Sequence, residues 1–173
     1  MRSYGVPAPD GKVFAELKKK YKGVVYKRRI TVPAAEVQPL LAGQRPLADY
    51  GQIGREIAWF QQLYNARPRV FIGYDRIAFA GVADPELRIT FDTNIRWRST
   101  QLELSAGDHG APLLPDDRVL LEVKLPGVCP LWLAHALTEA GAVPVSFSKY
   151  GSCYCHHLLR EQPVTLKEVF PCA

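Results

Sequence analysis

The sequence lacks the features that mark membrane, secreted and repetitive proteins. No apolar run approaches the ~18–20 residues that a membrane-spanning helix needs, and the opening residues MRSYGVPAPDGK contain no apolar stretch typical of a secretory signal. No repeat period is visible, which excludes a solenoid or a coiled coil. Apolar residues make up 47% of the 173 residues, enough for a sizeable core. We therefore expect one folded domain over residues 1–160, a tail over 161–173 and no membrane segment.

Cysteine is also scarce, with only Cys129, Cys153, Cys155 and Cys172. Four cysteines in a chain of this length do not indicate a disulfide scaffold, and without a signal we expect reduced thiols and a cytoplasmic protein. The cluster of Cys153, Cys155, His156 and His157 invites comparison with a zinc site. Its spacing is too tight for the usual structural zinc motif, so its role stays open.

Positive charge is concentrated at one end of the chain. The net charge is +5, yet residues 1–30 contain nine basic and two acidic residues, a net +7. This basic segment predicts an anionic partner, with a solvated surface as the alternative. Lysines interleaved with tyrosines in KKKYKGVVYKRR would also suit a nucleic-acid backbone, but we expect no nucleic acid, since that function does not explain the strand containing Glu122.

Residues 13–31 predict a β-hairpin whose two strands are joined by Lys22-Gly23. Pairing Tyr21 with Val24 fixes the register and sets Lys18 opposite Lys27. Alternation then places six residues on one side: Glu16, Lys18, Lys20, Val25, Lys27 and Arg29. A slip of one residue would exchange Lys27 for Arg28.

The rest of the chain predicts a mostly antiparallel α+β domain. We expect helices over residues 34–43, 49–64 and 130–140, strands over 69–79, 87–92 and 119–125, a polar loop over 99–117, and a last short strand or turn over 143–150.

Each predicted strand alternates between an apolar and a charged face, as a sheet with one side in water also would. Lys18 opposite Lys27 is a like-charge pair, which costs stability unless an anion lies between the two ammonium groups. Curvature would gather these cations with Arg88, Lys124 and Glu122. Such a space predicts a polyanion site with one carboxylate available for a divalent metal.

Five segments in order, ELKKKYKGVVYKRR, RVFIGYDRIAF, LRITFD, LLEVKL and SFSKYG, make the chain similar to the VTC domain of polyphosphate polymerases. That family lies within the CYTH or triphosphate tunnel metalloenzyme superfamily. The resemblance implies an antiparallel β-tunnel flanked by helices and lined by Lys, Arg and Glu. It also implies a transferase that moves the γ-phosphate of ATP to a growing polyphosphate chain with manganese or magnesium.

The resemblance implies a role for particular residues. The basic tunnel positions match Arg2, Lys18, Lys27, Arg76 and Arg88, the metal-binding glutamate matches Glu122, and the lysine of the SKY signature matches Lys149. We expect Lys149, Arg76 and Arg88 to act in catalysis. From strand alternation we add three substrate-binding residues: Lys20, Arg29 and Lys124.

Three of these residues have simpler explanations. Arg76 could pair only with the neighbouring Asp75, Glu122 could be a salt-bridge partner of Lys124, and Lys149 could be a surface lysine. The sequence contains no G-x-x-x-x-G-K-[ST] loop, so side chains would have to hold ATP.

The sequence departs from the family pattern at its start, where only Arg2-Ser3-Tyr4-Gly5 matches the end of the family's third strand. We therefore expect a tunnel without its first strands. The alternatives to a polymerase are a non-catalytic polyphosphate- or nucleotide-binding module, or an inactive gene remnant.

Overall fold

A computed structural model describes residues 1–159 of the chain. The chain forms two compact units: residues 1–73 with 98–110, and residues 74–97 with residues from 111 onward. The predicted tail at 161–173 lies outside the described residues.

The first unit is built around a two-stranded antiparallel hairpin, β1 (Lys12–Tyr21) and β2 (Val24–Pro33). Tyr21 pairs with Val24 and Lys18 with Lys27, so the predicted register is confirmed. The turn residues Lys22 and Gly23 have φ angles of 47° and 83°. Two positive φ values match the turn whose twist suits a two-residue hairpin.

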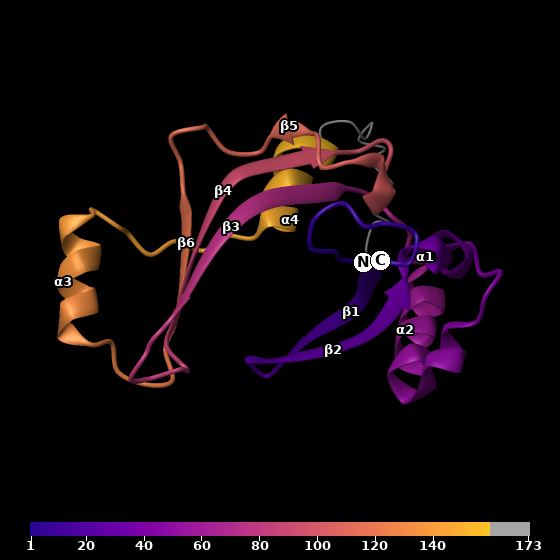
Figure 1. Ribbon diagram of the computed structural model, residues 1–173, viewed down its shortest axis with the longest axis horizontal. Helices are drawn as coiled ribbons and strands as arrows, with labels where there is room; N and C mark the ends of the chain where they lie inside the picture. Colours follow the sequence, from indigo (N-terminus) through magenta and orange to yellow (C-terminus); the bar gives the residue numbers. More distant parts are fainter. Residues whose placement is uncertain (160–173) are drawn as a thin grey trace, which may run out of the picture. The chain divides into compact units, whose positions relative to one another are not determined.

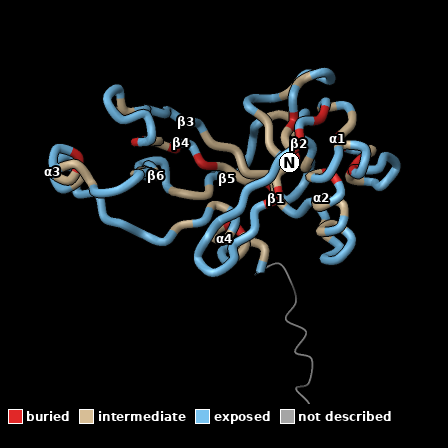
Figure 2. The backbone as a smooth tube through the Cα atoms, turned by 90° about the horizontal axis from the view of Figure 1, so that it is seen from below, coloured by how far each residue is buried: buried red, intermediate tan, exposed pale blue. Residues whose placement is uncertain are grey.

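One face of the hairpin packs against helices α1 (Ala34–Leu41) and α2 (Gly51–Tyr64), which lie on one side of it in Figure 1. The short helix η1 (Leu47–Tyr50) begins where the second predicted helix was expected to begin. The core cluster comprises Val13, Ala15, Ile30, Val32, Val37, Leu40 and Leu47, and Figure 2 marks buried stretches in these elements. Alternation along β1 and β2 therefore leaves the opposite face of the hairpin for charged side chains.

A buried arginine holds the loop over residues 99–110 of the first unit by hydrogen bonds. Arg98 is 7% exposed, and its guanidinium donates to the carbonyl oxygens of Gln101 (2.8 Å), His109 (2.7 Å) and Glu103 (3.1 Å). Its Cζ lies 3.6 Å from the centroid of the Phe71 ring. The segment that contains η2 (Leu104–Ala106) is thereby tied to this side chain.

The second unit contains a four-stranded antiparallel sheet. It consists of β3 (Phe71–Ala80), β4 (Arg88–Arg98), β5 (Ala111–Pro112) and β6 (Leu120–Lys124), with β3 beginning and β4 ending in the first unit. β4 lies between β3 and β5, and its first half pairs with β6 (Figure 1).

Strand β4 is longer than predicted. The predicted strand ended at Asp92. The structure continues it to Arg98 and pairs Arg96 with Pro112 and Trp97 with Ala111. The polar residues after Asp92 resemble a turn locally, but pairing with β5 at a distance in the sequence extends the strand.

The last part of the described chain corrects another prediction. Residues 143–148 form no strand, and helix α4 (Lys149–Cys153) begins where a strand or turn was expected, after α3 (Leu131–Glu139). The Ser148 hydroxyl accepts a hydrogen bond from the Gly151 amide at 3.1 Å, which is an N-cap. A π-helical turn, η3 (Tyr154–Leu158), follows directly.

Helices together with two antiparallel sheets confirm the predicted α+β class. The tunnel implied by the resemblance stays a prediction. Within residues 1–159, none of the helices combines the length and apolar character required to cross a bilayer.

Candidate functional site

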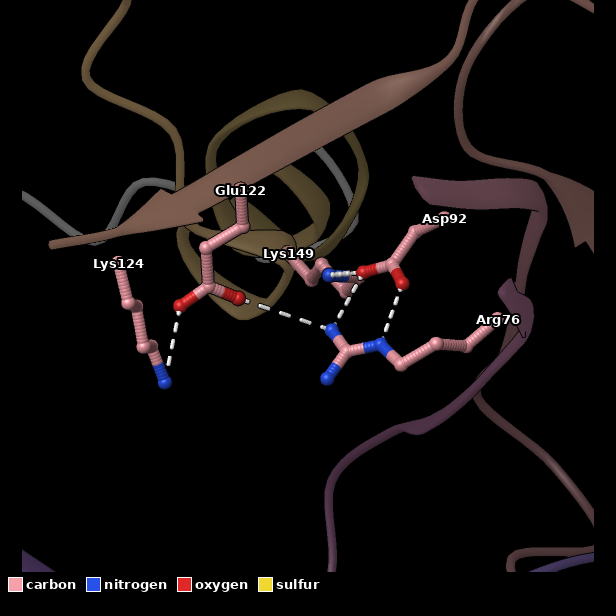
Figure 3. A network of polar contacts seen from close by, with 5 residues as sticks. All are labelled: Arg76, Asp92, Glu122, Lys124 and Lys149. Atoms are coloured by element: carbon pink, nitrogen blue, oxygen red, sulfur yellow. Dashed lines mark hydrogen bonds and ion pairs between the residues drawn. The ribbon is translucent and has the colours of Figure 1, made fainter. Parts of the chain in front are cut away.

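A buried carboxylate lies at the centre of the second unit. Asp92, in β4, is 0% exposed. It accepts two parallel hydrogen bonds from Arg76 of β3, from Nε to Oδ1 at 2.6 Å and from Nη2 to Oδ2 at 2.7 Å. Lys149 Nζ, at the start of α4, donates to Oδ2 at 2.5 Å. Figure 3 shows the side chains of Arg76 and Lys149 converging on Asp92.

The hydrogen bonds determine the ionisation of this group. Burial alone would raise the pKa of Asp92, but the hydrogen bonds from Arg76 and Lys149 outweigh burial, so that its pKa is lowered. The same hydrogen bond raises the pKa of Arg76 against the opposing effect of burial. Asp92 is therefore a carboxylate, and Arg76 a cation, at neutral pH.

An aromatic ring supports both cations. Arg76 Cζ lies 5.1 Å, and Lys149 Nζ 4.5 Å, from the centroid of the Tyr74 ring. Tyr74 and Arg76 are two positions apart on β3, so their side chains share one face of the strand. A ring face attracts cations within about 6 Å, so Tyr74 stabilises the same arrangement as Asp92.

A second carboxylate, that of Glu122, lies beside Arg76 and is accessible to solvent. Glu122 of β6 has a side chain that is 45% exposed; its Oε2 is 3.7 Å from Arg76 Nη2 and its Oε1 is 3.2 Å from Lys124 Nζ (Figure 3). Asp92 is covered and receives three hydrogen bonds, whereas Glu122 makes two long contacts. Of the two, Glu122 is the one that a dissolved ion could reach.

The strand register adds Arg88 to the same face. Arg88 pairs with Lys124 across β4 and β6, and Thr90 pairs with Glu122. Arg88 is exposed, and its side chain makes no hydrogen bond or ion pair within the part of the chain that the structure describes. Arg76, Arg88, Lys124 and Lys149 thus contribute four cations to one face, together with Asp92 and Glu122.

The hairpin of the first unit carries the other predicted cations. Lys18 lies opposite Lys27, and Lys27 Nζ forms an ion pair with Glu16 at 2.7 Å. Burial would raise the pKa of Glu16, yet the hydrogen bond and charge of Lys27 lower it. Glu16 thus offsets part of the repulsion expected between the two lysines, while Lys18 and Lys20 remain exposed.

Arg29 and Arg2 lie at the other end of this hairpin face. Arg29 Cζ is 4.8 Å from the centroid of the Phe14 ring. Arg2 exchanges two backbone hydrogen bonds of 2.8 Å with Phe14 and places its guanidinium 4.9 Å from the Tyr4 ring. The register also excludes the predicted slip of one residue, because Arg28 points to the helical side and pairs with Glu56 of α2 at 3.5 Å.

Two local alternatives are decided by these contacts. The alternative in which Arg76 pairs only with Asp75 is wrong, because Asp75 accepts hydrogen bonds from Asn94 at 3.0 Å and Arg96 at 3.2 Å. An ion pair of Glu122 with Lys124 is confirmed. Sequence reasoning missed Asp92 as a site residue. The available signal was an acidic residue in phase with Arg88 on the predicted charged face.

Two members of the cysteine–histidine cluster, Cys153 and His157, pack against the rest of the chain. Cys153 is 0% exposed, and the His157 ring stacks on Trp97 with centroids 4.3 Å apart. Among residues 1–159, no three or more His, Cys, Asp or Glu side chains are grouped as metal ligands.

The amino-acid sequence matches a known domain family. A family model, the VTC domain, matches residues 1–157. The chain belongs to the VTC domain family. The match covers most of the 173 residues and confirms the resemblance drawn from the five ordered segments. No curated protein matches this VTC domain chain at a significant level.

Proposed function

We propose that this VTC domain chain is an ATP-dependent polyphosphate polymerase, which transfers the γ-phosphate of ATP to a growing polyphosphate chain. One observation carries the proposal: a single sheet face combines four cations with one buried and one accessible carboxylate. In phosphoryl transfer, a protein acts mainly by positioning the reactants and stabilising charge. Family membership supports the same function.

Each side chain on this face would have a separate task. Arg76 and Arg88 would bind phosphate oxygens of the triphosphate, and Lys149 would contact the phosphate being transferred. Arginine suits the first task, because its planar fork of donors matches two phosphate oxygens at once. Lys124, which is exposed beside Glu122, would add a further cation for the substrate.

The residues fit a divalent ion in one way only. Glu122 is accessible whereas Asp92 is covered, and within residues 1–159 no three or more His, Cys, Asp or Glu side chains are grouped as a ligand set. Mg²⁺ commonly binds through one or two carboxylates while substrate phosphates and water complete its shell. We therefore propose Glu122 as the single protein ligand of manganese or magnesium, which would neutralise charge that develops on the phosphates.

The hairpin face would bind the polyphosphate chain. Lys18, Lys20, Lys27 and Arg29 belong to one register, with Arg2 joined to β1 beside them. Several cations in a row favour a repeating anion over a compact one. ATP and polyphosphate are the partners we propose, in the cytoplasm, and a β-tunnel remains the fold expected for a member of this family.

Incubation with ATP and manganese tests the function directly. We expect polyphosphate to form, detected by gel electrophoresis and by phosphorus NMR, and we expect a chelator to stop its formation. The variant Lys149→Ala should lose most turnover, because Lys149 would contact the phosphate being transferred. Tripolyphosphate binding by the unaltered chain with no ATP consumption would instead favour the non-catalytic binding module.

A further inference from the structure

We infer that Asp92 is a positioning residue, which holds Arg76 and Lys149 as a preformed receptor for one phosphate group. The inference rests on the proposed function, because it assigns the receptor to the same sheet face. Asp92 touches no solvent, so it would act only through the two cations that it holds.

The geometry of Arg76 gives the first argument. Asp92 occupies Nε and one N–H of Nη2, which fixes the plane of the guanidinium. Nη1 makes no hydrogen bond to any residue between 1 and 159, and in Figure 3 it points away from Asp92. A guanidinium that is held along one edge presents the rest of its donors in a defined direction.

Lys149 gives the second argument. An ammonium group has three N–H donors, and Asp92 accepts from one of them at 2.5 Å, while the Tyr74 ring lies 4.5 Å away. Lys149 Nζ and Arg76 Nη2 both donate to Oδ2 of Asp92. One carboxylate oxygen thus fixes the separation of the two cations, and a phosphate with several oxygens can bridge them.

Electrostatics alone predicts the opposite effect of removing this charge. A carboxylate beside two cations weakens their attraction for an anion, so Asp92→Asn should bind anions more tightly if only charge mattered. If Asp92 positions the cations, the variant should bind inorganic tripolyphosphate about tenfold more weakly, because an amide cannot accept both arginine hydrogen bonds and the lysine hydrogen bond.

Calorimetry with tripolyphosphate on the full chain decides between these effects. Asp75→Asn is the matched control. Asp75 lies between Tyr74 and Arg76 on β3 with its side chain on the opposite face, so the variant removes the same charge and leaves the Asp92 network intact. We expect Asp75→Asn to bind like the unaltered chain. Equal or tighter binding by Asp92→Asn would overturn the positioning role while leaving the proposed function standing.

A spectroscopic measurement on the unaltered chain covers the case in which Asp92→Asn fails to fold. The Nε–Hε NMR signal of Arg76, identified by its loss in Arg76→Lys, should be protected from exchange with water before tripolyphosphate is added. A signal that becomes protected only with tripolyphosphate would overturn the inference. If the unaltered chain binds no tripolyphosphate, the proposed function fails first and the inference with it.

Discussion

Asp92 and Glu122 are chemically similar side chains in opposite surroundings. Asp92 is buried and accepts three hydrogen bonds, whereas Glu122 is exposed and forms two ion pairs of 3.2 and 3.7 Å. Environment therefore separates a carboxylate suited to holding cations in place from one suited to binding an ion from solution.

The first prediction concerns Glu122→Gln, which preserves shape and removes charge. We expect loss of most metal-dependent ATP turnover, with a melting temperature within a few degrees of the unaltered chain, because half-exposed ion pairs contribute about 0–1 kcal/mol. Asp117→Asn, at an exposed pair with Arg118, is the control for charge removal. A large drop in the melting temperature would show instead that Glu122 is structural.

The second prediction concerns pH. The pKa of Asp92 is lowered in the folded state, so its contribution to stability is fully present above its unfolded pKa of about 3.9 and is lost as pH falls through the folded pKa. The free energy of unfolding should therefore fall more steeply below about pH 3.9 in the unaltered chain than in Asp92→Asn.

Urea denaturation at each pH measures this difference. Other carboxylates with lowered pKa values, including Glu16 and Asp75, are common to both proteins and so cancel in the comparison. Parallel curves would mean that Asp92 has an ordinary pKa in the folded chain.

The sequence could predict Arg76, Arg88, Glu122 and Lys149 as members of one group, but not what Asp92 does. Alternation placed Asp92 on a charged face, where exposure is the usual state. Its burial depends on Lys149, 57 positions along the chain, and no local pattern reports a contact at that separation.

At the scale of elements, the hairpin makes the third prediction. Lys18→Ala with Lys27→Ala should weaken polyphosphate binding by about tenfold or more, since two charge-assisted contacts are lost, and should reduce its dependence on salt. Calorimetry at two ionic strengths measures both effects. Lys19→Ala with Arg55→Ala removes equal charge from other surfaces of the same unit; a loss just as large there would mean that only net charge matters.

The fourth prediction tests the packing of α2 on η1. A methyl group added at Gly54 would lie 1.9 Å from the carbonyl oxygen of Leu47, which is far inside van der Waals contact. Gly54→Ala should therefore destabilise the chain by about 1–3 kcal/mol, although alanine normally favours a helix interior. Urea denaturation should show no comparable loss for Gly127→Ala, where an added methyl meets nothing within 4 Å.

Elements were predictable where their signals are local. The hairpin follows from Lys22-Gly23 and alternation, and α2 ends at Asn65, whose φ of 46° suits a helix end. The second half of β4 depends on β5, which pairs with it over only two residues. Helix α4 did have a local signal, the serine that caps it, but residues 143–150 were predicted as a short strand or turn.

At the scale of the whole molecule, charge and structure divide the chain differently. The basic segment of residues 1–30 lies within the first unit, while the face that contains Asp92 lies within the second. Composition revealed the first surface at once. The second surface combines four cations with two carboxylates and becomes visible only when strands from separate parts of the sequence are paired.

Family membership was predictable because it depends on the order of segments over the whole chain. The tunnel is an expectation that comes from the family resemblance alone. The α+β class could be predicted from the sequence because segments of alternating periodicity occur together with segments of helical periodicity.

The buried guanidinium of Arg98 has a consequence for chemical labelling. Dicarbonyl reagents must reach a guanidinium to modify it, and Arg98 is the one arginine of residues 1–159 that is buried. Arg88 and Arg118 are exposed, so mass spectrometry of the folded protein should find both modified long before Arg98. Once Arg98 does react, its three carbonyl contacts are broken. Labelling should therefore proceed in two phases, with the exposed arginines modified early and Arg98 late.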